Sequence, residues 1–439
     1  MPDVSPFRGA LYNTSVAGPI TDLVAPPYDV ISPEARLLLH ERSPHNITHV
    51  SLPDGSGDAD RYAHAARLLD RWLADGILAL DDQPTLYVYQ QTFQVAAMGW
   101  RTRTGILGAV RLAPWGEGIH PHERTIPSHK EDRLRLLRAT RSNVSPIFAL
   151  YPDEHMEVEA LWSPELSLAP VYEFADDADV VHRLWRLSSG VAADVRAALA
   201  AHDVYIADGH HRYETALAFR DEVASSEGPL PDDSPYNYVM MYLTNMDHPE
   251  GLVILPAHRV LTGVTREQWS RFDRRVGEAF DVETFDLTSD TELSCAHRIV
   301  GRMAELARDR HAFALYRGEG RIRLLTLRDT RPLDELRKRG RIQNSVDLDV
   351  PILHALLLEE YLGLEACNDG PECNVTYVVE ADEAMRSVDS GEAGGAFLLN
   401  PSTVEQVRRV AAKGEKMPGK ATYFYPKLIS GLVVRLLSA

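Results

Sequence analysis

The chain has little that would place it in a membrane or in an oxidising compartment. None of its segments approaches the roughly 18 uninterrupted apolar residues that a membrane span needs. The first residues, MPDVSPFRGA, do not form the basic-then-apolar run of a signal peptide. The three cysteines have neither CxxC spacing nor a nearby pair of histidines, which argues against structural zinc. We therefore expect a cytoplasmic protein whose cysteines are ordinary thiols, namely Cys295, Cys367 and Cys373.

Positive charge is also scarce. The chain carries 46 Lys and Arg residues against 64 Asp and Glu residues, a formal net charge of −18. Nonspecific binding to nucleic acid or to an anionic membrane needs a basic face, so we expect neither partner. Its apolar content of 44% and charged content of 25% are ordinary for a globular protein. At 439 residues the chain exceeds the usual size of a single core, and two or three lobes are expected.

The most informative segment is residues 204–217, VYIADGHHRYETAL. An apolar strand runs into a glycine turn, and a helix with an Ala/Leu face begins just beyond it. Free backbone N–H groups at a helix N-terminus and the helix dipole both favour a bound anion. Since two imidazoles and a guanidinium lie on this first turn, the segment suits phosphate, and a carboxylate before the glycine could hold a metal ion that the phosphates share. An exposed polar corner is the alternative interpretation. The residues concerned are Asp208, Gly209, His210, His211 and Arg212.

Two other polar segments accompany this one. Residues 116–125, GEGIHPHERT, are too rich in turn-forming and charged residues to be core. Residues 417–427, MPGKATYFYPK, combine lysines, a hydroxyl and three aromatic rings near the C-terminus. A packed tail with solvated lysines explains the second segment equally well.

Hydrophobic periodicity outlines the rest of the chain. An amphipathic helix is predicted over 58–75, and a long hairpin over 85–91 and 104–112. Residues 32–35, SPEA, suggest a helix start with serine as N-cap and proline at the first helical position. Residues 151–200 look like a connecting helical region. Beyond residue 265, strands are predicted at 311–316, 321–327, 376–379 and 395–399, and helices at 265–280, 289–309, 347–362, 380–391 and 403–413.

Together, the three polar segments resemble a known arrangement. DGHHR at 208–212 resembles the nucleotide-phosphate motif of the ParB/sulfiredoxin superfamily, in which a strand-turn-helix clamps phosphates. Among its members the archaeal free serine kinases are similar in having Pro-His-Glu upstream, DGHHR in the middle and Pro-Lys-Thr-Thr near the C-terminus. Here these elements are 121–123, 208–212 and 418–422, the last with an inserted glycine and one threonine fewer. The whole chain resembles a family of bacterial and archaeal proteins known as domain of unknown function 1015, by PPYDVI, HERT, DGHHRYETAL and FYPKLxSGL.

The resemblance implies a mixed α/β fold with a ParB/sulfiredoxin-like nucleotide-binding core. That core would span 116–262, with an added N-terminal α/β region at 1–115. A C-terminal α/β lobe at 263–439 would send its tail back to the site. The activity implied is a nucleotide-dependent phosphotransferase acting on a small hydroxy amino acid, most simply a free serine kinase that uses ATP or ADP with Mg²⁺, or the reverse or phosphatase direction. A homodimer is compatible with this interpretation.

The resemblance also implies roles for individual residues. Glu123 and Asp208 would be catalytic, and Asp208 would also ligate the metal. Gly209, His210, His211 and Arg212 would bind the nucleotide phosphates. The substrate would be held by His122, Arg124, Lys420 and Thr422.

Two other classes of function stay open. A nucleotide-sensing, ParB-like binding module would not turn over a small substrate, and a scaffold would keep only a degenerate site. The partition-protein version would want a helix-turn-helix and a basic surface, and we find neither. A further set of polar residues could reach a ligand or serve turns through Asx hydrogen bonds. These are Asp29, Asn46, Asn245, Asp247, His258 and Arg259.

Overall fold

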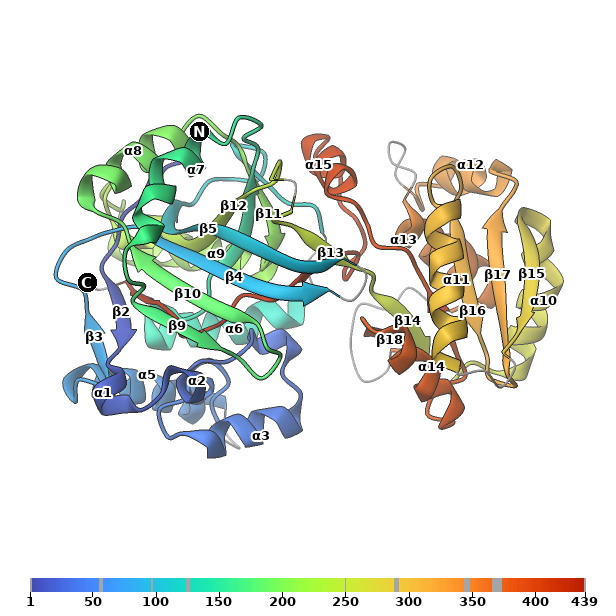
Figure 1. The fold of residues 1–439 in the computed structure, drawn as a ribbon, viewed down its shortest axis with the longest axis horizontal. Coiled ribbons are helices and arrows are strands. Elements are labelled where there is room, and N and C mark those ends of the chain that lie inside the picture. Colours follow the sequence, from blue (N-terminus) through green and yellow to red (C-terminus); the bar gives the residue numbers. More distant parts are fainter. Residues whose placement is uncertain are drawn as a thin grey trace. The chain divides into compact units, whose positions relative to one another are not determined.

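A computed structural model describes residues 2–54, 58–95, 98–123, 127–248, 250–287, 292–342, 348–364 and 373–437. The chain forms two compact units (Figure 1). Unit 1 contains Met1–Pro121, Thr125–Val253 and Pro426–Ala439, and unit 2 contains His122–Arg124 and Ile254–Tyr425. Across the described ranges, no helix has both the length and the apolar character needed to cross a membrane.

Unit 1 is built on a large mixed sheet. Within the described residues it has nine strands, in the order β6-β11-β8-β12-β5-β4-β10-β9, with β1 paired to β5. The pairs β6/β11 and β8/β12 are parallel, and the remaining pairs are antiparallel. The strands are β1 (Val4–Ser5), β4 (Tyr87–Val95), β5 (Gly99–Arg111), β6 (Ile119–His120), β8 (Ile147–Tyr151), β9 (Tyr172–Ala175), β10 (Val181–Arg186), β11 (Val204–Asp208) and β12 (Tyr238–Asn245).

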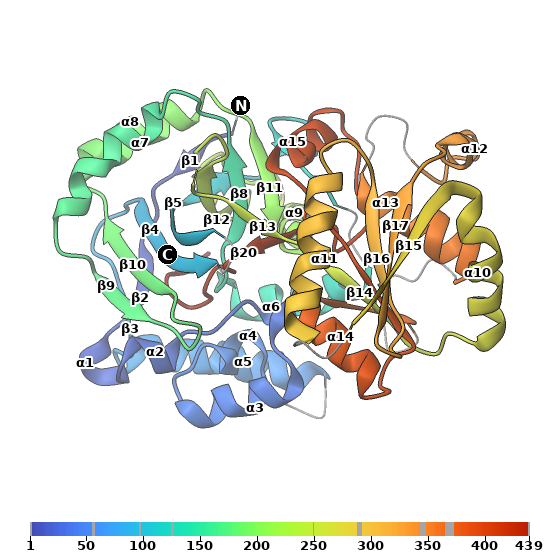
Figure 2. The same ribbon diagram turned by 45° about the vertical axis from the view of Figure 1, so that its right-hand side comes forward.

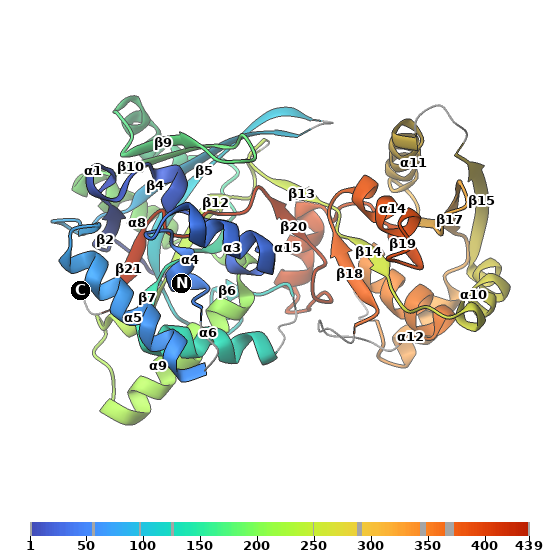
Figure 3. The same cartoon turned by 90° about the horizontal axis from the view of Figure 1, so that it is seen from below.

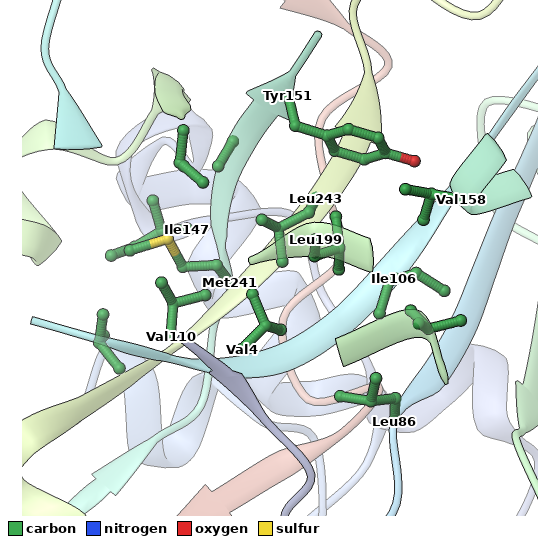
Figure 4. Close-up of a cluster of buried hydrophobic side chains, with 14 of the residues drawn as sticks. Val4, Leu86, Ile106, Val110, Ile147, Tyr151, Val158, Leu199, Met241 and Leu243 are labelled. Atoms are coloured by element: carbon green, nitrogen blue, oxygen red, sulfur yellow. The ribbon is translucent and has the colours of Figure 1, made fainter. Parts of the chain in front are cut away.

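Helices α7 (Glu157–Trp162) and α8 (Ser189–Leu199) cover this sheet along one side (Figure 2). Their apolar residues join those of the strands in one buried cluster, which includes Val158, Leu199, Ile106, Leu243 and Val4 (Figure 4). Each fully buried aliphatic side chain contributes about 1.5–3 kcal/mol. This cluster therefore anchors the strands that lead to the DGHHR segment.

Three further helices form a succession in unit 1 (Figure 3). Helix α9 (His210–Glu227) contacts β8 and β12, α6 (Pro127–Thr140) packs on α9, and α5 (Asp58–Ala74) packs on α6. Leucines of α6 and Phe219 and Val223 of α9 share a small apolar cluster. Helix α9 is thus held from both sides, and its N-terminus is fixed relative to the sheet.

A second sheet joins the two ends of the chain within unit 1. Its strands lie in the order β3-β2-β21-β7, so β21, from the C-terminal end of the chain, lies between β2, near the N-terminal end, and β7. Their bounds are β2 (Gly9–Tyr12), β3 (Leu78–Leu80), β7 (Ser142–Asn143) and β21 (Val434–Leu436). The remaining short helical segments of unit 1 are α1 (Thr14–Ala17), α2 (Ile20–Leu23), η1 (Tyr28–Val30), α3 (Pro33–Arg42), α4 (Thr48–Ser51), η2 (Ser163–Ser167) and η3 (Pro235–Asn237).

Unit 2 contains an antiparallel sheet with helices on both faces. In the part of unit 2 that is described, six strands follow the order β15-β17-β16-β19-β14-β18. Along β19, Ala396 and Leu398 join the cluster of α11 and α14, whereas Phe397 contacts Phe272 of α10. This alternation follows from the period of two in a strand. The strands are β14 (His258–Leu261), β15 (Phe280–Asp286), β16 (Ala312–Tyr316), β17 (Arg321–Leu327), β18 (Val375–Val378) and β19 (Gly395–Leu398).

Capping residues define several helices of unit 2. Thr265 and Gln268 form a capping box at the start of α10 (Arg266–Ala279), and Thr403 and Gln406 form another at α15 (Val404–Ala412). The other helices are α11 (Glu292–Leu306), α12 (Arg331–Lys338), α13 (Asp349–Ile352), the π-helical η4 (Leu353–Leu362) and α14 (Ala381–Asp389). Two short strands, β13 (Val253–Leu255) and β20 (Tyr423–Tyr425), pair with each other. The chain passes from unit 1 to unit 2 after Val253 and returns to unit 1 after Tyr425.

The mixed α/β class expected from the sequence is confirmed, and most predicted elements are present. Ser32 caps α3 with Pro33 at its start, and α5 begins at the predicted residue. The connecting region 151–200 is wrong in part, because β9 and β10 form a hairpin in the large sheet. Their alternation was hidden by the charged residues on the exposed positions. Strand β15 was missed for the same reason, since it is an edge strand with acidic exposed positions.

Two other expectations need comment. Cys373 is disulfide-bonded, so the expectation of ordinary thiols is wrong for this residue. The division into 1–115, 116–262 and 263–439 stays a prediction. Sheet pairing continues across residue 115, because β5 lies beside β12, and the compact units are therefore used below.

Candidate functional site

The DGHHR segment of unit 1 forms the predicted strand-turn-helix corner. Strand β11 ends at Asp208, Gly209 takes the left-handed conformation (φ 94°, ψ 26°), and α9 begins at His210. Only glycine adopts this conformation without strain. Helix α9 therefore begins directly after the strand, and the backbone N–H groups at a helix N-terminus favour a bound anion.

Asp208 accepts hydrogen bonds from two positively charged side chains at this corner. One carboxylate oxygen accepts from Arg212 Nη2 at 2.9 Å, and the other accepts from Lys427 Nζ at 3.0 Å. The side chains of Arg212 and Lys427 are only 13% and 12% exposed, and that of Asp208 is 21% exposed. Screening by solvent is therefore weak. The three charges sum to +1 beside a helix N-terminus, in a chain whose net charge is −18.

Arg212 is fixed by further contacts. Its Nη1 donates to Ser145 Oγ at 2.8 Å and to the carbonyl oxygen of Pro146. Its guanidinium also lies against Gly209, where an added Cβ would come within 2.9–3.0 Å of it. The absence of a side chain at residue 209 is thus needed both for the backbone conformation and for the position of this arginine.

Lys427 is held in place through its backbone. Its carbonyl oxygen accepts from Gln91 Nε2 at 3.0 Å, and the preceding carbonyl, of Pro426, accepts from Arg103 Nη2 at 2.5 Å. Arg103 is fully buried, with its Cζ atom 4.5 Å from the ring centroid of Phe148. Burial lowers the pKa of Arg103. The buried arginine therefore anchors the segment that brings Lys427 to Asp208.

Tyr28, from the PPYDVI segment, also lies near this corner. Burial raises the pKa of Tyr28, and Asp29 raises it further, while Arg133 and Arg212 lower it. The Cζ atom of Arg133 stands 4.2 Å from the centroid of the tyrosine ring. The phenol stays protonated at neutral pH and can serve as a hydrogen-bond donor.

The geometry does not fit the expectation that Asp208 ligates Mg²⁺. Both of its carboxylate oxygens already accept from a cation, and a divalent ion would add a third positive group around a single carboxylate. Across the residues whose placement is described, no group of three or more His, Cys, Asp or Glu side chains is arranged to hold a metal. Asp208 is better described as the residue that positions Arg212 and Lys427.

In unit 2, Glu123 meets the C-terminal polar segment. Its Oε1 accepts from the backbone N–H groups of Ala421 and Thr422, each at 3.1 Å, and from Thr422 Oγ1 at 3.0 Å. His122 Nε2 lies 2.9 Å from the same hydroxyl oxygen. If His122 donates through Nε2, the threonine hydroxyl accepts from the imidazole and donates to the carboxylate. Within unit 2, the structure therefore brings His122 and Glu123 of one predicted element against Thr422 of another.

A second arginine supports this arrangement. Arg259 is completely buried, and its Nη2 donates to the carbonyl oxygen of Lys420 at 3.1 Å. Lys420 has a φ of 57°, so the chain turns sharply just before Ala421 and Thr422 present their N–H groups to Glu123. The guanidinium also contacts His354 Nε2 at 3.2 Å. Arg259 is thus a structural residue of the loop rather than an exposed ligand-binding group.

Comparison with known families gives a direct match. The family model described as protein of unknown function (DUF1015) matches residues 4–350. The chain belongs to the DUF1015 family. A search of curated proteins gave no match.

Solved structures give distant likenesses. A conserved hypothetical protein from Pyrococcus furiosus is 14% identical with a TM-score of 0.32, covering 73% of this chain and 94% of that one. A free serine kinase in complex with AMP is also 14% identical with a TM-score of 0.32, covering 70% and 84%. SbnI from Staphylococcus aureus, truncated at its C-terminus, is 13% identical with a TM-score of 0.37, covering 75% and 87%. Likenesses this distant assign no activity to the DUF1015 chain.

The predicted site residues of this DUF1015 chain form two groups. Asp208, Gly209 and Arg212 belong to unit 1, where His210 is buried at the start of α9 and His211 follows it half-buried. His122, Glu123, Lys420 and Thr422 belong to unit 2. Arg124 lies outside the described residues. Apart from the metal-ligand role of Asp208, which its contacts do not favour, the roles assigned to these residues stay predictions.

Two of the less specific candidates, Asn46 and Asn245, have structural hydrogen bonds. Asn46 is fully buried and bonds the backbone of Asp22, Val24 and Thr48. Asn245 is equally buried; it donates to the carbonyl oxygen of Asp153, and its side-chain oxygen accepts from the backbone N–H of Asp247. Both serve the turn-forming duty that was the alternative interpretation.

Sequence reasoning missed Lys427 and Arg103. Lys427 lies within the FYPKL motif, but the resemblance to the serine kinase element points to Lys420 instead. Arg103 lies in the middle of β5, where an alternating strand gives no sign that one arginine points into the core. Its role in holding Lys427 is evident from its hydrogen bonds to Pro426 and to Gln91, which in turn bonds Lys427.

Proposed function

We propose that this DUF1015 chain is a nucleotide-dependent phosphotransferase that acts on a small hydroxy amino acid, with serine as the first candidate and ATP or ADP as donor. The observation that supports it most is the corner at Asp208–Gly209–His210, where a helix N-terminus meets two well-fixed cations. Phosphoryl transfer depends chiefly on positioning and on neutralising the charge of the phosphates. Backbone amides can position the phosphates, and the guanidinium and ammonium groups of this corner can neutralise their charge.

In this proposal the corner of unit 1 binds the nucleotide phosphates. The N–H groups that follow Gly209 approach the phosphate oxygens, and Arg212 offers a planar fork of donors. Lys427 adds a compact charge. Each donor aimed at the developing charge contributes roughly 2.7–4 kcal/mol to lowering the barrier. Asp208 acts through the cations that it positions, and no step is assigned to a metal held by it.

Glu123 is proposed as the residue that receives or orients the acceptor hydroxyl. Three hydrogen-bond donors to Oε1 hold its carboxylate in one position. A general base must be held within hydrogen-bond distance of the proton that it accepts. The hydroxyl of Thr422 is engaged by His122 and Glu123, so we assign it to holding Glu123 rather than to binding the substrate carboxylate. His122, Arg124 and Lys420 remain the proposed substrate-binding residues.

The test is turnover of a Glu123→Gln variant. Glutamine keeps an acceptor oxygen for the N–H groups of Ala421 and Thr422 but loses charge and basicity. We expect phosphoserine formation from serine and ATP or ADP to fall by at least two orders of magnitude, with nucleotide affinity unchanged within a few fold. Phosphate transfer is followed by ³¹P NMR, and nucleotide affinity by calorimetry. Turnover at the wild-type rate would mean that the proposed role of Glu123 is wrong.

Two controls complete the experiment. Glu383→Gln changes an exposed glutamate of α14 in the same unit and is expected to leave turnover unchanged. Supplying phosphoserine with and without nucleoside diphosphate separates reverse transfer from hydrolysis. Nucleotide binding with no turnover in either direction would favour the sensing module, and absence of any nucleotide binding would favour the scaffold.

A further inference from the structure

A cavity of about 70 Å³ lies within unit 1, beside the inner side of the DGHHR corner. Segments far apart in the sequence line it, with Tyr28, Arg133, Arg212 and Ser430 among the lining residues. Part of its wall is apolar, from leucines of α6 and from Val239 of β12. The rest of the wall carries hydroxyl and guanidinium groups, so the lining is partly polar and partly apolar.

Three buried hydroxyls line this cavity without a hydrogen-bond partner. They belong to Ser51 of α4, Ser142 of β7 and Thr215 of α9, and their oxygens form no hydrogen bond with any residue that the structure describes. The residues are 3%, 5% and 3% exposed. A buried polar group without a partner is costly, and native proteins satisfy nearly all such groups. Three of them around one space indicate that the space is occupied when the protein is functional.

Two guanidinium groups also line the cavity, and both are rigidly placed. Arg212 is held by Asp208 and Ser145, and Arg133 donates to Asp132 and to the carbonyl oxygen of Ser51. The side chain of Arg133 is 9% exposed, and its guanidinium stacks on Tyr28. Hydroxyl donors combined with fixed guanidinium groups are the usual way in which proteins bind oxyanions.

Size restricts the occupant. A water molecule needs roughly 10–15 Å³ of such space, so about 70 Å³ accepts a few waters or one small ion, and a nucleoside is too large. We propose that this cavity is a binding site for a small oxyanion, either a phosphate ion or a small carboxylate. The oxygens of the bound ion accept hydrogen bonds from the hydroxyls of Ser51, Ser142 and Thr215. The positive charges of Arg133 and Arg212 stabilise the negative charge of the ion. The inference is separate from the proposed function, since it needs neither a nucleotide nor phosphoryl transfer.

The test uses Thr215→Val in the full chain, because valine has the shape of threonine without its hydroxyl. Binding of inorganic phosphate and of acetate is measured by calorimetry at low ionic strength in a zwitterionic buffer, so that the two ions distinguish the two sources of the oxyanion. We expect saturable binding of at least one ion, and a loss of tenfold or more in affinity in the variant. Without the ion, the melting temperature of the variant is expected to equal or exceed that of the wild type, because an unpaired hydroxyl has been removed.

Matched variants make the outcome decisive. Ser142→Ala removes a second hydroxyl and is expected to weaken the same ion. Ser225 lies on the same helix α9, but its hydroxyl donates to the backbone carbonyl oxygen of Asp221. Ser225→Ala is therefore expected to have no effect on binding. No saturable binding of either ion, with a lower melting temperature for Thr215→Val, would identify the occupant as structural water and overturn the inference. Binding that is lost in Lys427→Met but unchanged in Thr215→Val would also overturn it, because the ion would then lie at the start of α9.

Discussion

Replacing Gly209 with alanine is expected to destabilise unit 1 by about 2.5–5 kcal/mol. Alanine at a φ of 94° costs about 1–2 kcal/mol from backbone strain. In addition, its Cβ would lie 2.9–3.0 Å from the guanidinium of Arg212. That guanidinium is bound to Asp208, Ser145 and Pro146, so moving it sacrifices charge-assisted hydrogen bonds worth about 1.5–3 kcal/mol. Chemical unfolding of the full chain measures the sum.

Gly76 provides the matched control. It also lies in unit 1 with a positive φ, 70°, but nothing stands within 4 Å of a Cβ built there. Gly76→Ala should therefore cost only the backbone term, and the difference between the two variants isolates the displacement of Arg212. Equal losses in both variants would show that Arg212 moves at no cost, and its assignment as a fixed group of the phosphate corner would then fail.

The corner around Gly209 was predictable because its chemistry is local. A strand, a glycine and a helix that starts with basic residues follow one another without interruption, and the structure has them at β11, Gly209 and α9. The pairing of Glu123 with Thr422 could be anticipated only through the resemblance to the serine kinases. No periodicity in the sequence links two residues that are 299 positions apart.

The rest of the site depends on long-range packing. Lys427 reaches Asp208 because Arg103, buried in the middle of a strand, holds the neighbouring backbone. The hydroxyls of Ser51, Ser142 and Thr215 come from three separate elements, and each alone is an ordinary small polar residue. A sequence pattern reports which face of an element is buried, but it does not report which buried polar groups meet.

The same limit explains the errors in the fold. Helices with a wide apolar face, such as α5, were located to within a residue. The hairpin of β9 and β10 was missed because arginines and acidic residues occupy its outward positions and mask the alternation. Edge and hairpin strands with one charged face are stabilised by their partners, so their own composition says little.

Lowering the pH from 7.5 to 4.5 is expected to destabilise unit 2 through His258. Burial, with a smaller contribution from Arg259, lowers the pKa of His258 from 6.5 to about 4. Above pH 6.5 the imidazole is neutral in both folded and unfolded chains. Between pH 6.5 and 4 only the unfolded chain takes up the proton, so the free energy of unfolding falls as the pH falls, by about 3 kcal/mol in all. His354, whose pKa burial lowers to about 3, changes stability in the same direction.

His258→Asn removes the titrating group and tests its contribution. The Nδ1 atom of His258 accepts from the backbone N–H of Leu399 at 3.1 Å, and the asparagine side-chain oxygen can replace that acceptor. The variant is expected to lose about 2.5 kcal/mol less than the wild type between pH 7.5 and 4.5, as measured by urea unfolding across that range. His64→Asn, at an exposed position of α5, should leave the pH dependence as it is in the wild type. An unchanged slope in His258→Asn would mean that the buried imidazole is protonated in the folded chain, and that the environment of Arg259 tolerates a second positive charge.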